Sequence, residues 1–409
     1  MSSPRRIFYG WYVVIAALVI TTTTSGLVFY NLSILLAAFV SERGFPVALA
    51  SSATAAFFIA GGIGGVLAGR LVDRMDARIV IATSACIGAA SLATVGLVRE
   101  VWQLFAFHLV FGLAHGATGL VPVTTVLARW FNVRRSLAFS IGSTGLSLGG
   151  LLIAPTVAFS IERYGISAAA PWMALAMFLG IVPVTVLVLR ASPRSMGLQP
   201  DGLSLAEMAE SPPQPSTPFS EARRSAYFFG VSAAYTFLLG AQVGAIAHLY
   251  RLASTRDSAT TAAIALAVMA TCSTIGRLIG GALLLKVPAR VFALILMAMQ
   301  AGALSLLALA SDRAAILIAT VLFAITIGNS LMMHPLLLAE RFGTRDYGRI
   351  YSTSQMMTVL GVAGCPALIG LLYEMSGGYQ VPFFVISGLT LVGLAVLYTF
   401  AASRRPSAT

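Results

Sequence analysis

The sequence predicts an all-α integral membrane protein with twelve transmembrane helices in two pseudo-symmetric six-helix bundles. Its 409 residues are 58% hydrophobic and only 10% charged, whereas soluble domains carry about 25% charged residues. Apolar runs of about 20 residues, the length that crosses a bilayer, recur along the whole chain. So little polar surface suits a chain whose outer face contacts lipid rather than water.

Twelve apolar runs give the expected spans. The first run begins at Trp11 and is too long for the core of a cleaved signal peptide, so we expect it to be retained as a span. The spans are expected at residues 11–38, 46–68, 79–98, 102–127, 136–159, 170–190, 225–249, 259–283, 291–310, 314–338, 350–373 and 380–401.

The net charge of +12 does not indicate binding to nucleic acid, because the cations form short scattered clusters rather than one basic face. Of the 26 cations, 19 fall on the side that holds both termini, six fall on the other side, and Arg277 lies inside a span. The positive-inside rule therefore predicts cytoplasmic termini, and we expect a multi-pass protein of the cell (inner) membrane. The 19 are Arg5, Arg6, Arg70, Arg74, Arg78, Arg129, Arg134, Arg135, Arg190, Arg194, Arg223, Arg224, Lys286, Arg290, Arg341, Arg345, Arg349, Arg404 and Arg405.

A proline-rich segment, residues 191–223, separates the first six spans from the last six. Its six prolines with serines and acids predict a cytoplasmic linker without a packed core. We expect one bundle at residues 1–190 and the other at 224–409. An internal repeat supports the division, because Phe131 corresponds to Phe342 at an offset of 211 residues. Two parallel six-helix halves are typical of transporters that bind substrate near the bilayer midplane at the repeat interface.

One loop resembles the signature of a known family. The segment GRLVDRMDAR, residues 69–78, is similar to the loop motif between spans 2 and 3 of the major facilitator superfamily. In this sequence Asp76 stands where that motif usually has glycine, so we expect a different turn there. The resemblance implies a transporter fold over nearly the whole chain.

Three further features resemble the monocarboxylate transporter and oxalate/formate antiporter branch. They are YGWYVV at residues 9–14, RWFNVRRSLA at 129–138 followed by Gly142, Gly145, Gly149 and Gly150, and an arginine, Arg277, in span 8. The resemblance implies a carboxylate-binding role for Arg277. Two departures concern substrate and coupling. Ser354 replaces the lysine of dicarboxylate antiporters, which favours a single substrate carboxylate. Ser273 replaces an aspartate of the animal monocarboxylate transporters, which argues against their scheme of proton coupling.

Arg277 is also the strongest candidate on physical grounds. An arginine in mid-span costs roughly 2.5–3.5 kcal/mol on insertion scales and usually faces a cavity or a partner. All 14 acidic residues fall outside the expected spans, so a bound anion is an attractive partner for a guanidinium that suits two-bond contact with a carboxylate. The alternative is that Arg277 extends towards the cytoplasm, about six residues away.

Other polar side chains within spans are candidates to line a substrate cavity, the alternative being hydrogen bonds between helices. Histidines among them could also relay a proton. These candidates are Tyr30, Asn31, His115, Tyr235, Gln242, Asn329, His334, Tyr351 and Ser354. For gating we single out Gly69, Asp73, Arg74, Arg78 and Arg134, with Asp73 pairing with a cation or a helix N-terminus in one conformation only.

The sequence favours a secondary active transporter of a small organic anion, with a monocarboxylate preferred, by rocker-switch alternating access. It shows no ATP-binding motif and no metal spacing, and we expect no enzymatic activity and no cofactor. The expected partners are the anion, a proton or counter-anion, and the bilayer, with no nucleic acid and a monomeric state. Two alternatives stay open: an exporter of lipophilic or drug-like compounds, and a ligand-sensing membrane receptor without net transport.

Overall fold

The structure is a computed structural model that describes residues 8–203 and 216–400. Within these ranges the chain is helical almost throughout, and the β-contact found there is one isolated bridge, between Ser216 and Gly343. Arg5, Arg6, Arg404, Arg405 and part of the predicted linker lie outside the described residues. The all-α fold class is confirmed.

The helices form two compact units. The first contains residues 1–216 and 343–352, and the second contains residues 217–342 and 353–409. The boundary along the linker therefore falls between Ser216 and Thr217, inside the predicted linker. Gly343–Ser352, which we expected in the second bundle, packs with the first unit.

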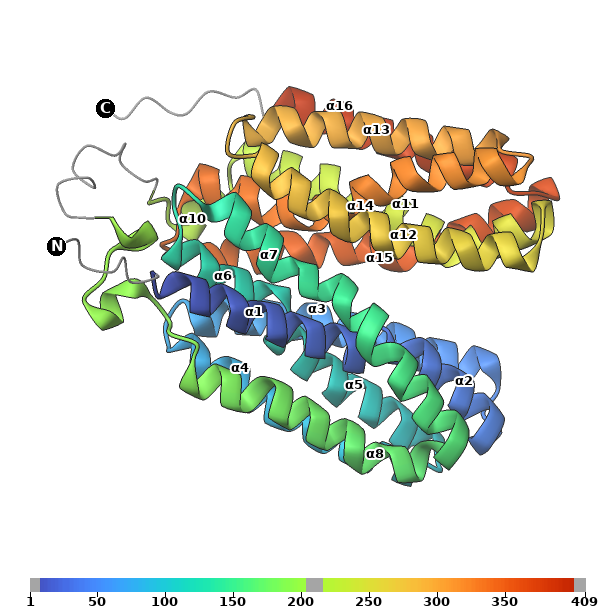
Figure 1. The fold of residues 1–409 in the computed structure, drawn as a ribbon, viewed down its shortest axis with the longest axis horizontal. Coiled ribbons are helices and arrows are strands. Elements are labelled where there is room, and N and C mark those ends of the chain that lie inside the picture. Colours follow the sequence, from blue (N-terminus) through green and yellow to red (C-terminus); the bar gives the residue numbers. More distant parts are fainter. Residues whose placement is uncertain (1–7, 204–215, 401–409) are drawn as a thin grey trace, which may run out of the picture. The chain divides into compact units, whose positions relative to one another are not determined.

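Helices of the first unit are drawn blue to green in Figure 1 and lie alongside one another. They are α1 Gly10–Thr24, α2 Asn31–Arg43, α3 Val47–Val72, α4 Ala77–Thr94, α5 Val101–Thr118, α6 Leu120–Trp130, α7 Arg135–Leu148 and α8 Ala154–Leu187. Helices of the second unit, yellow to red, are α11 Ala226–Arg256, α12 Ala259–Leu283, α13 Ala289–Leu309, α14 Arg313–Phe342, α15 Tyr347–Ser376 and α16 Gln380–Phe400. A short helix, α10 Phe219–Ala222, precedes α11, and the first turns of α15 belong to the first unit.

Eleven helical stretches of the described residues are long and apolar enough to cross a membrane. One of them, Arg135–Leu187, has 53 residues, which as a straight helix would measure about 80 Å, more than twice the bilayer core. Gly165 interrupts it with φ 78° and ψ 164°, a conformation outside the helical region. The stretch therefore contains two crossings, and the chain makes the twelve that the sequence predicts.

Several helices are longer than the expected spans. Four acidic residues consequently lie inside helices, just beyond the ends of the expected spans, rather than in loops: Glu42, Glu162, Glu340 and Glu374. The reason is that a helix continues past the apolar run until a cap or a glycine ends it. Gly44, in the left-handed region after α2, is one such stop.

Small and hydroxylated residues bring α1 and α7 into close contact. Thr21 donates to the carbonyl of Gly142 at 2.6 Å, and Ser25 donates to that of Leu146 at 2.6 Å. Each helix then widens into a π-helical turn, at Ser25–Phe29 and Gly149–Ile153. A Cβ at Gly145 would collide with the hydroxyl oxygen of Thr21. Such contacts replace hydrophobic burial as the source of stability between helices in lipid.

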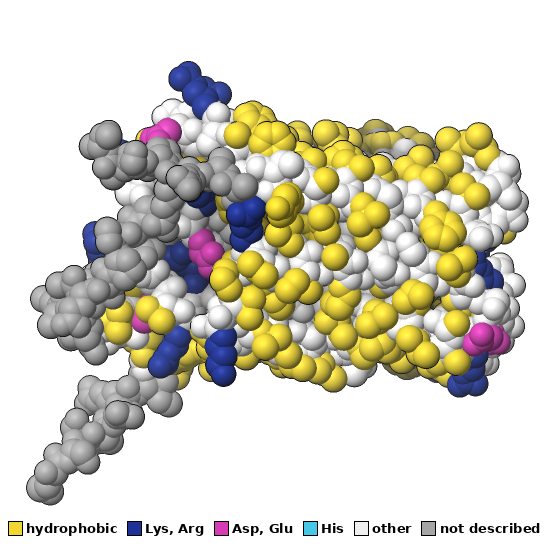
Figure 2. Space-filling view, turned by 90° about the horizontal axis from the view of Figure 1, so that it is seen from above, with side chains coloured by type: hydrophobic (Ala, Val, Ile, Leu, Met, Phe, Trp, Pro, Cys, Tyr) yellow, Lys and Arg dark blue, Asp and Glu magenta, His cyan; other side chains and the backbone are white. Residues whose placement is uncertain are grey.

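The surface matches a protein in lipid. On the face shown in Figure 2, hydrophobic side chains cover the broad middle, and Lys and Arg side chains gather near its ends. Exposed apolar side chains such as Trp172, Leu360 and Met375 are 72–76% accessible. In water these residues would form a large aggregation-prone surface, whereas hydrocarbon accepts them without cost.

Candidate functional site

Arg277 lies in the second half of α12 and is 1% exposed, which argues against the interpretation that its side chain extends to water. Its Nε donates a hydrogen bond of 2.7 Å to the carbonyl of Gly328 on α14. The approach is close because Gly328 has no side chain, and a Cβ there would meet the carbonyl oxygen of Ser273. The structure thus buries a guanidinium at the contact of two spanning helices.

Asn329 follows Gly328 on α14 and is also 1% exposed. Its Nδ2 donates to the carbonyls of Gly276 and Ile325, both at 2.9 Å. Its amide nitrogen is therefore engaged with backbone on both helices. Arg277 and Asn329, two of the predicted site residues, are brought to the same contact between α12 and α14.

A second group of predicted residues meets where α11, α14 and α15 pack together. His334 Nε2 lies 2.7 Å from Ser354 Oγ, and Ser354 Oγ lies 2.7 Å from Ser232 Oγ. The His334 ring stacks on Tyr235, with 4.6 Å between centroids and 11° between planes. Ser232, which is buried in α11, is the member of this group that sequence reasoning missed.

Three other predicted site residues, Tyr30, Asn31 and His115, belong to the first unit. Tyr30 is 39% exposed and sits over Gly150, whereas Asn31 is buried and donates to the carbonyl of Leu27 at 3.0 Å. His115 stacks on Phe57, and its Nδ1 is buried without a hydrogen-bond partner among the described residues.

Tyr351 and Gln242 complete the predicted set. Tyr351 is buried and stacks on Tyr347, one turn earlier on α15, with 5.9 Å between ring centroids. Gln242 is buried in α11, and its Oε1 has no hydrogen-bond partner within the described ranges.

The predicted gating loop, which follows α3, contacts the start of α15 within the first unit. Asp73, at the C-terminal end of α3, accepts hydrogen bonds from the backbone amides of Gly348 at 3.1 Å and Arg349 at 2.9 Å. Arg129 approaches the same carboxylate at 3.4 Å. Gly69 allows the approach, because a Cβ there would meet the Gly348 carbonyl and the Ser352 hydroxyl. Asp73 thus contacts both a cation and a helix N-terminus.

Two opposing effects act on the ionisation of Asp73. Burial raises the pKa of its carboxyl to about 6, against the lowering effect of the amide of Arg349 and the guanidinium of Arg129. Its side chain is 3% exposed. Desolvation therefore outweighs the partners, and the carboxyl titrates close to physiological pH.

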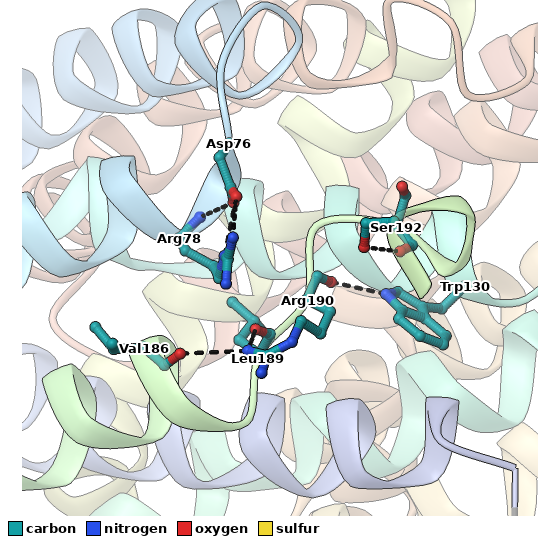
Figure 3. A network of polar contacts seen from close by, with 8 residues as sticks. Asp76, Arg78, Trp130, Val186, Leu189, Arg190 and Ser192 are labelled. Atoms are coloured by element: carbon teal, nitrogen blue, oxygen red, sulfur yellow. Dashed lines mark hydrogen bonds and ion pairs between the residues drawn. The ribbon is translucent and has the colours of Figure 1, made fainter. Parts of the chain in front are cut away.

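Asp76, the departure from the family motif, caps α4. Its carboxylate accepts from the amide of Arg78 at 2.9 Å and pairs with the Arg78 guanidinium at 2.6 Å (Figure 3). This hydrogen-bonded guanidinium lowers the pKa of Asp76. The backbone at Asp76 is extended, with φ −65°, so no glycine is required. An aspartate is a good N-cap in that conformation. Arg78 is thus engaged in a local pair rather than with another loop.

A second residue, Asp201, was missed by sequence reasoning. Asp201, in the linker, accepts from three consecutive backbone amides: Asn132 at 2.7 Å, Val133 at 2.8 Å and Arg134 at 3.1 Å. These amides precede α7, so the carboxylate caps a helix whose own N-cap residue, Arg134, offers no side-chain bond. The sequence predicted only a linker without a packed core around Asp201.

The chain is also held just before the linker begins. Trp130 donates from Nε1 to the carbonyl of Arg190 at 2.7 Å (Figure 3). Arg190 in turn donates to the carbonyls of Val186 and Leu189 at the end of α8. Of the predicted gating residues, Arg134 donates its backbone amide to Asp201. The bonds found among the described residues include none from the side chain of Arg74.

No group of three or more potential metal ligands occurs among the residues that the structure describes. Twelve crossings in two helical units, with a buried guanidinium and buried polar clusters inside them, define the class: a multi-pass membrane protein built as a solute carrier.

Comparison with known proteins identifies the family. The sequence matches the family model of the Major Facilitator Superfamily over residues 18–339 and 249–409, and the chain belongs to this superfamily. The resemblance inferred from the loop motif is thereby confirmed.

Among its relatives is monocarboxylate transporter 13 of Bos taurus, 23% identical over 403 residues, which cover 96% of this chain and 89% of the relative. MFS transporter asaE of Aspergillus flavus is 25% identical over 337 residues, covering 80% and 72%. Among solved structures, the human organic anion transporter MFSD10 has a TM-score of 0.71 at 16% identity, covering 97% of this chain and all of the other. At that identity the structural likeness shows the fold alone.

Proposed function

We propose that the protein is a secondary active transporter of a small organic anion, with a monocarboxylate as the preferred substrate, working by rocker-switch alternating access. The observation that carries the proposal is the buried guanidinium of Arg277 within a spanning helix. Burying such a group is expensive, and intramembrane cations usually serve function. A guanidinium also matches a carboxylate in geometry and charge.

The relatives support the same substrate class. A monocarboxylate transporter matches nearly the whole chain, and MFSD10, a human protein of like fold, is an organic anion transporter. Ser354, in place of a second span cation, favours a substrate with one carboxylate. Its hydroxyl contacts His334 instead.

Counterflow in proteoliposomes with labelled small carboxylates tests the proposal. We expect one or more carboxylates to exchange, and Arg277→Gln to abolish the exchange. Arg251→Gln is a matched control, because Arg251 is an exposed arginine on α11 that lies over the ring of Tyr373. A folded preparation that exchanges no carboxylate would refute the anion transporter and favour export of lipophilic compounds. Undiminished exchange by Arg277→Gln would remove Arg277 from the site.

We further propose that both termini are cytoplasmic and that the protein resides in the cell (inner) membrane. The support is the 19-to-6 distribution of cations on the expected loops. Single cysteines at Ser195 and Ser254 test it by labelling with a membrane-impermeant reagent in whole cells. We expect Ser254→Cys to react and Ser195→Cys to be protected, and the reverse pattern would overturn the orientation.

The loop of Gly69, Asp73, Arg74 and Arg78, together with Arg134, is proposed as the gate. Its support is the hydrogen bond that the backbone amide of Arg349, at the amino end of α15, donates to the Asp73 carboxylate, since a gate needs a contact of this kind that forms in one conformation and opens in another.

A further inference from the structure

We infer that Asn329 is a positioning residue for Arg277 and that the clamp they form fixes the level of the guanidinium on α14 and withholds its Nε from a carboxylate. The inference rests on the proposed anion transport. It assigns Asn329 a role through Arg277 rather than through direct contact with substrate.

The clamp is reciprocal. Arg277 on α12 donates to the carbonyl of Gly328 on α14, and Asn329 on α14 donates to the carbonyl of Gly276 on α12. Each helix therefore contributes one side-chain donor and one adjacent backbone acceptor. A shift of either helix along its axis would break both bonds together, so the pair fixes the level of Arg277 relative to α14.

Glycines make the clamp specific. The Oδ1 atom of Asn329 occupies the space that a Cβ at Gly280 would take, and a Cβ at Gly328 would press on the backbone of Arg277. The amide orientation is determined by chemistry, because a flipped amide would set its oxygen against the carbonyls of Gly276 and Ile325. The Asn329 side chain consequently has one arrangement in this contact.

The bond from Nε has a consequence for recognition. A guanidinium can bind a carboxylate with two parallel bonds through Nε and one Nη, or through both Nη atoms. Nε–H of Arg277 is directed at Gly328. The Nε–H is therefore engaged with Gly328 and is not offered to a substrate carboxylate while this bond is intact. A lysine at this position would retain the charge but would lack the planar set of donors with which a guanidinium can bond the Gly328 carbonyl and a carboxylate in a fixed geometry.

The test compares Asn329→Ala and Gly280→Ala with Gly302→Ala. Gly302, on α13, has open space around its Cβ position and serves as the matched control. In counterflow we expect both test variants to raise KM for the carboxylate about tenfold, the effect of losing one or two hydrogen bonds. The maximal exchange rate should stay within about twofold of the wild type, since the clamp acts on binding.

The discriminating readout is the preference for the carboxylate over the uncharged amide of the same acid. Misplacing Arg277 should reduce that preference, whereas general damage to the fold would lower transport of both compounds equally. Gly280→Ala keeps the inference testable if Asn329→Ala does not fold, because it displaces the same amide from the opposite helix.

The outcomes separate the inference from the proposed function. Wild-type KM and wild-type preference in a folded Asn329→Ala variant would overturn the inference while Arg277→Gln still abolishes exchange. If Arg277→Gln exchanged carboxylates as the wild type does, the proposed function of Arg277 would fail first, and the positioning role with it.

Discussion

At the scale of single residues, the ionisation of Asp73 is the most informative property. Its carboxylate is buried and receives two backbone amides, yet burial raises its pKa from 3.8 to about 6. A contact that holds this carboxyl out of water therefore favours its protonated form. If the contact opens and Asp73 meets water, the pKa returns towards its ordinary value.

This difference predicts a pH dependence for the gate. Asp73 binds a proton more tightly while it contacts the amino end of α15, so low pH stabilises that contact. This stabilisation, up to roughly 3 kcal/mol, is lost as pH rises from about 4 to above 6. We expect counterflow to change with pH across that window in the wild type. In Asp73→Asn, which cannot ionise, the pH-dependent component should disappear and the exchange rate at neutral pH should differ from that of the wild type.

The measurement is the exchange rate between pH 4.5 and 7.5 with equal pH on both sides of the vesicle. Asp76→Asn is the control, because Asp76 pairs with Arg78 and its pKa is lowered rather than raised. Identical pH profiles and rates for wild type and Asp73→Asn would eliminate Asp73 as a gate.

At the scale of secondary-structure elements, one glycine decides whether a 53-residue helical stretch makes one crossing or two. Gly165 adopts φ 78° and ψ 164°, a region available almost only to glycine. Beyond it, the amide of Ile166 donates to both oxygens of Glu42 at 3.0–3.2 Å. The reversal therefore depends on a backbone conformation and on an acidic cap from another helix.

Gly165→Ala should destabilise the folded protein by about 1–3 kcal/mol, because alanine is strained in this conformation. A Cβ there would also lie 3.2 Å from a carboxylate oxygen of Glu42. The thermal midpoint and folded yield in detergent provide the measurement. Gly388→Ala is the control, since Gly388 is helical in α16 with open space around its Cβ position; it should be neutral or slightly stabilising. Equal midpoints for the two variants would contradict this account of the turn.

At the scale of the whole chain, the linker is attached to the helical units rather than being a free tether along its described length. Asp201 binds the three amides before α7 in the first unit. In the second unit, the amide of Thr217 donates to the carbonyl of Phe342 at 3.0 Å. Phe342 is the residue that the internal repeat relates to Phe131. The described ends of the linker thus dock on repeat-related loops, each within its own unit.

Asp201→Asn should loosen the first of these attachments. Asparagine tolerates the left-handed backbone of residue 201, φ 58°, so the substitution mainly removes the charge. We expect the amides of residues 132–134 to exchange with deuterium at least about tenfold faster, because hydrogen bonds to a charged group contribute about 1.5–3 kcal/mol. Mass spectrometry of the corresponding peptides measures this change. Glu221→Gln, a charge loss at an exposed linker position, should leave the exchange unchanged, and equal rates in both variants would disprove the attachment.

The candidate site was only partly predictable. Mid-span position identified Arg277, and the histidine, tyrosine and serine of the second cluster were foreseen as individual polar groups. That these three side chains contact one another was not predicted. Asn329 was predicted as a cavity residue, and the structure shows its amide bonded to backbone. Asp201 was missed because a carboxylate in a turn has no pattern that distinguishes a solvated residue from a helix cap.

The sequence by itself determined the class of protein, the twelve crossings and the family, because apolar runs of bilayer length have few alternatives to crossing as helices. The tertiary structure alone decided that Arg277 bonds to Gly328, that Asp73 caps α15 and that Asp201 caps α7. These partners are separated by 51 to 276 residues. Hydropathy depends on each residue and its near neighbours, whereas a hydrogen bond between helices depends on register and close approach, which only packing determines.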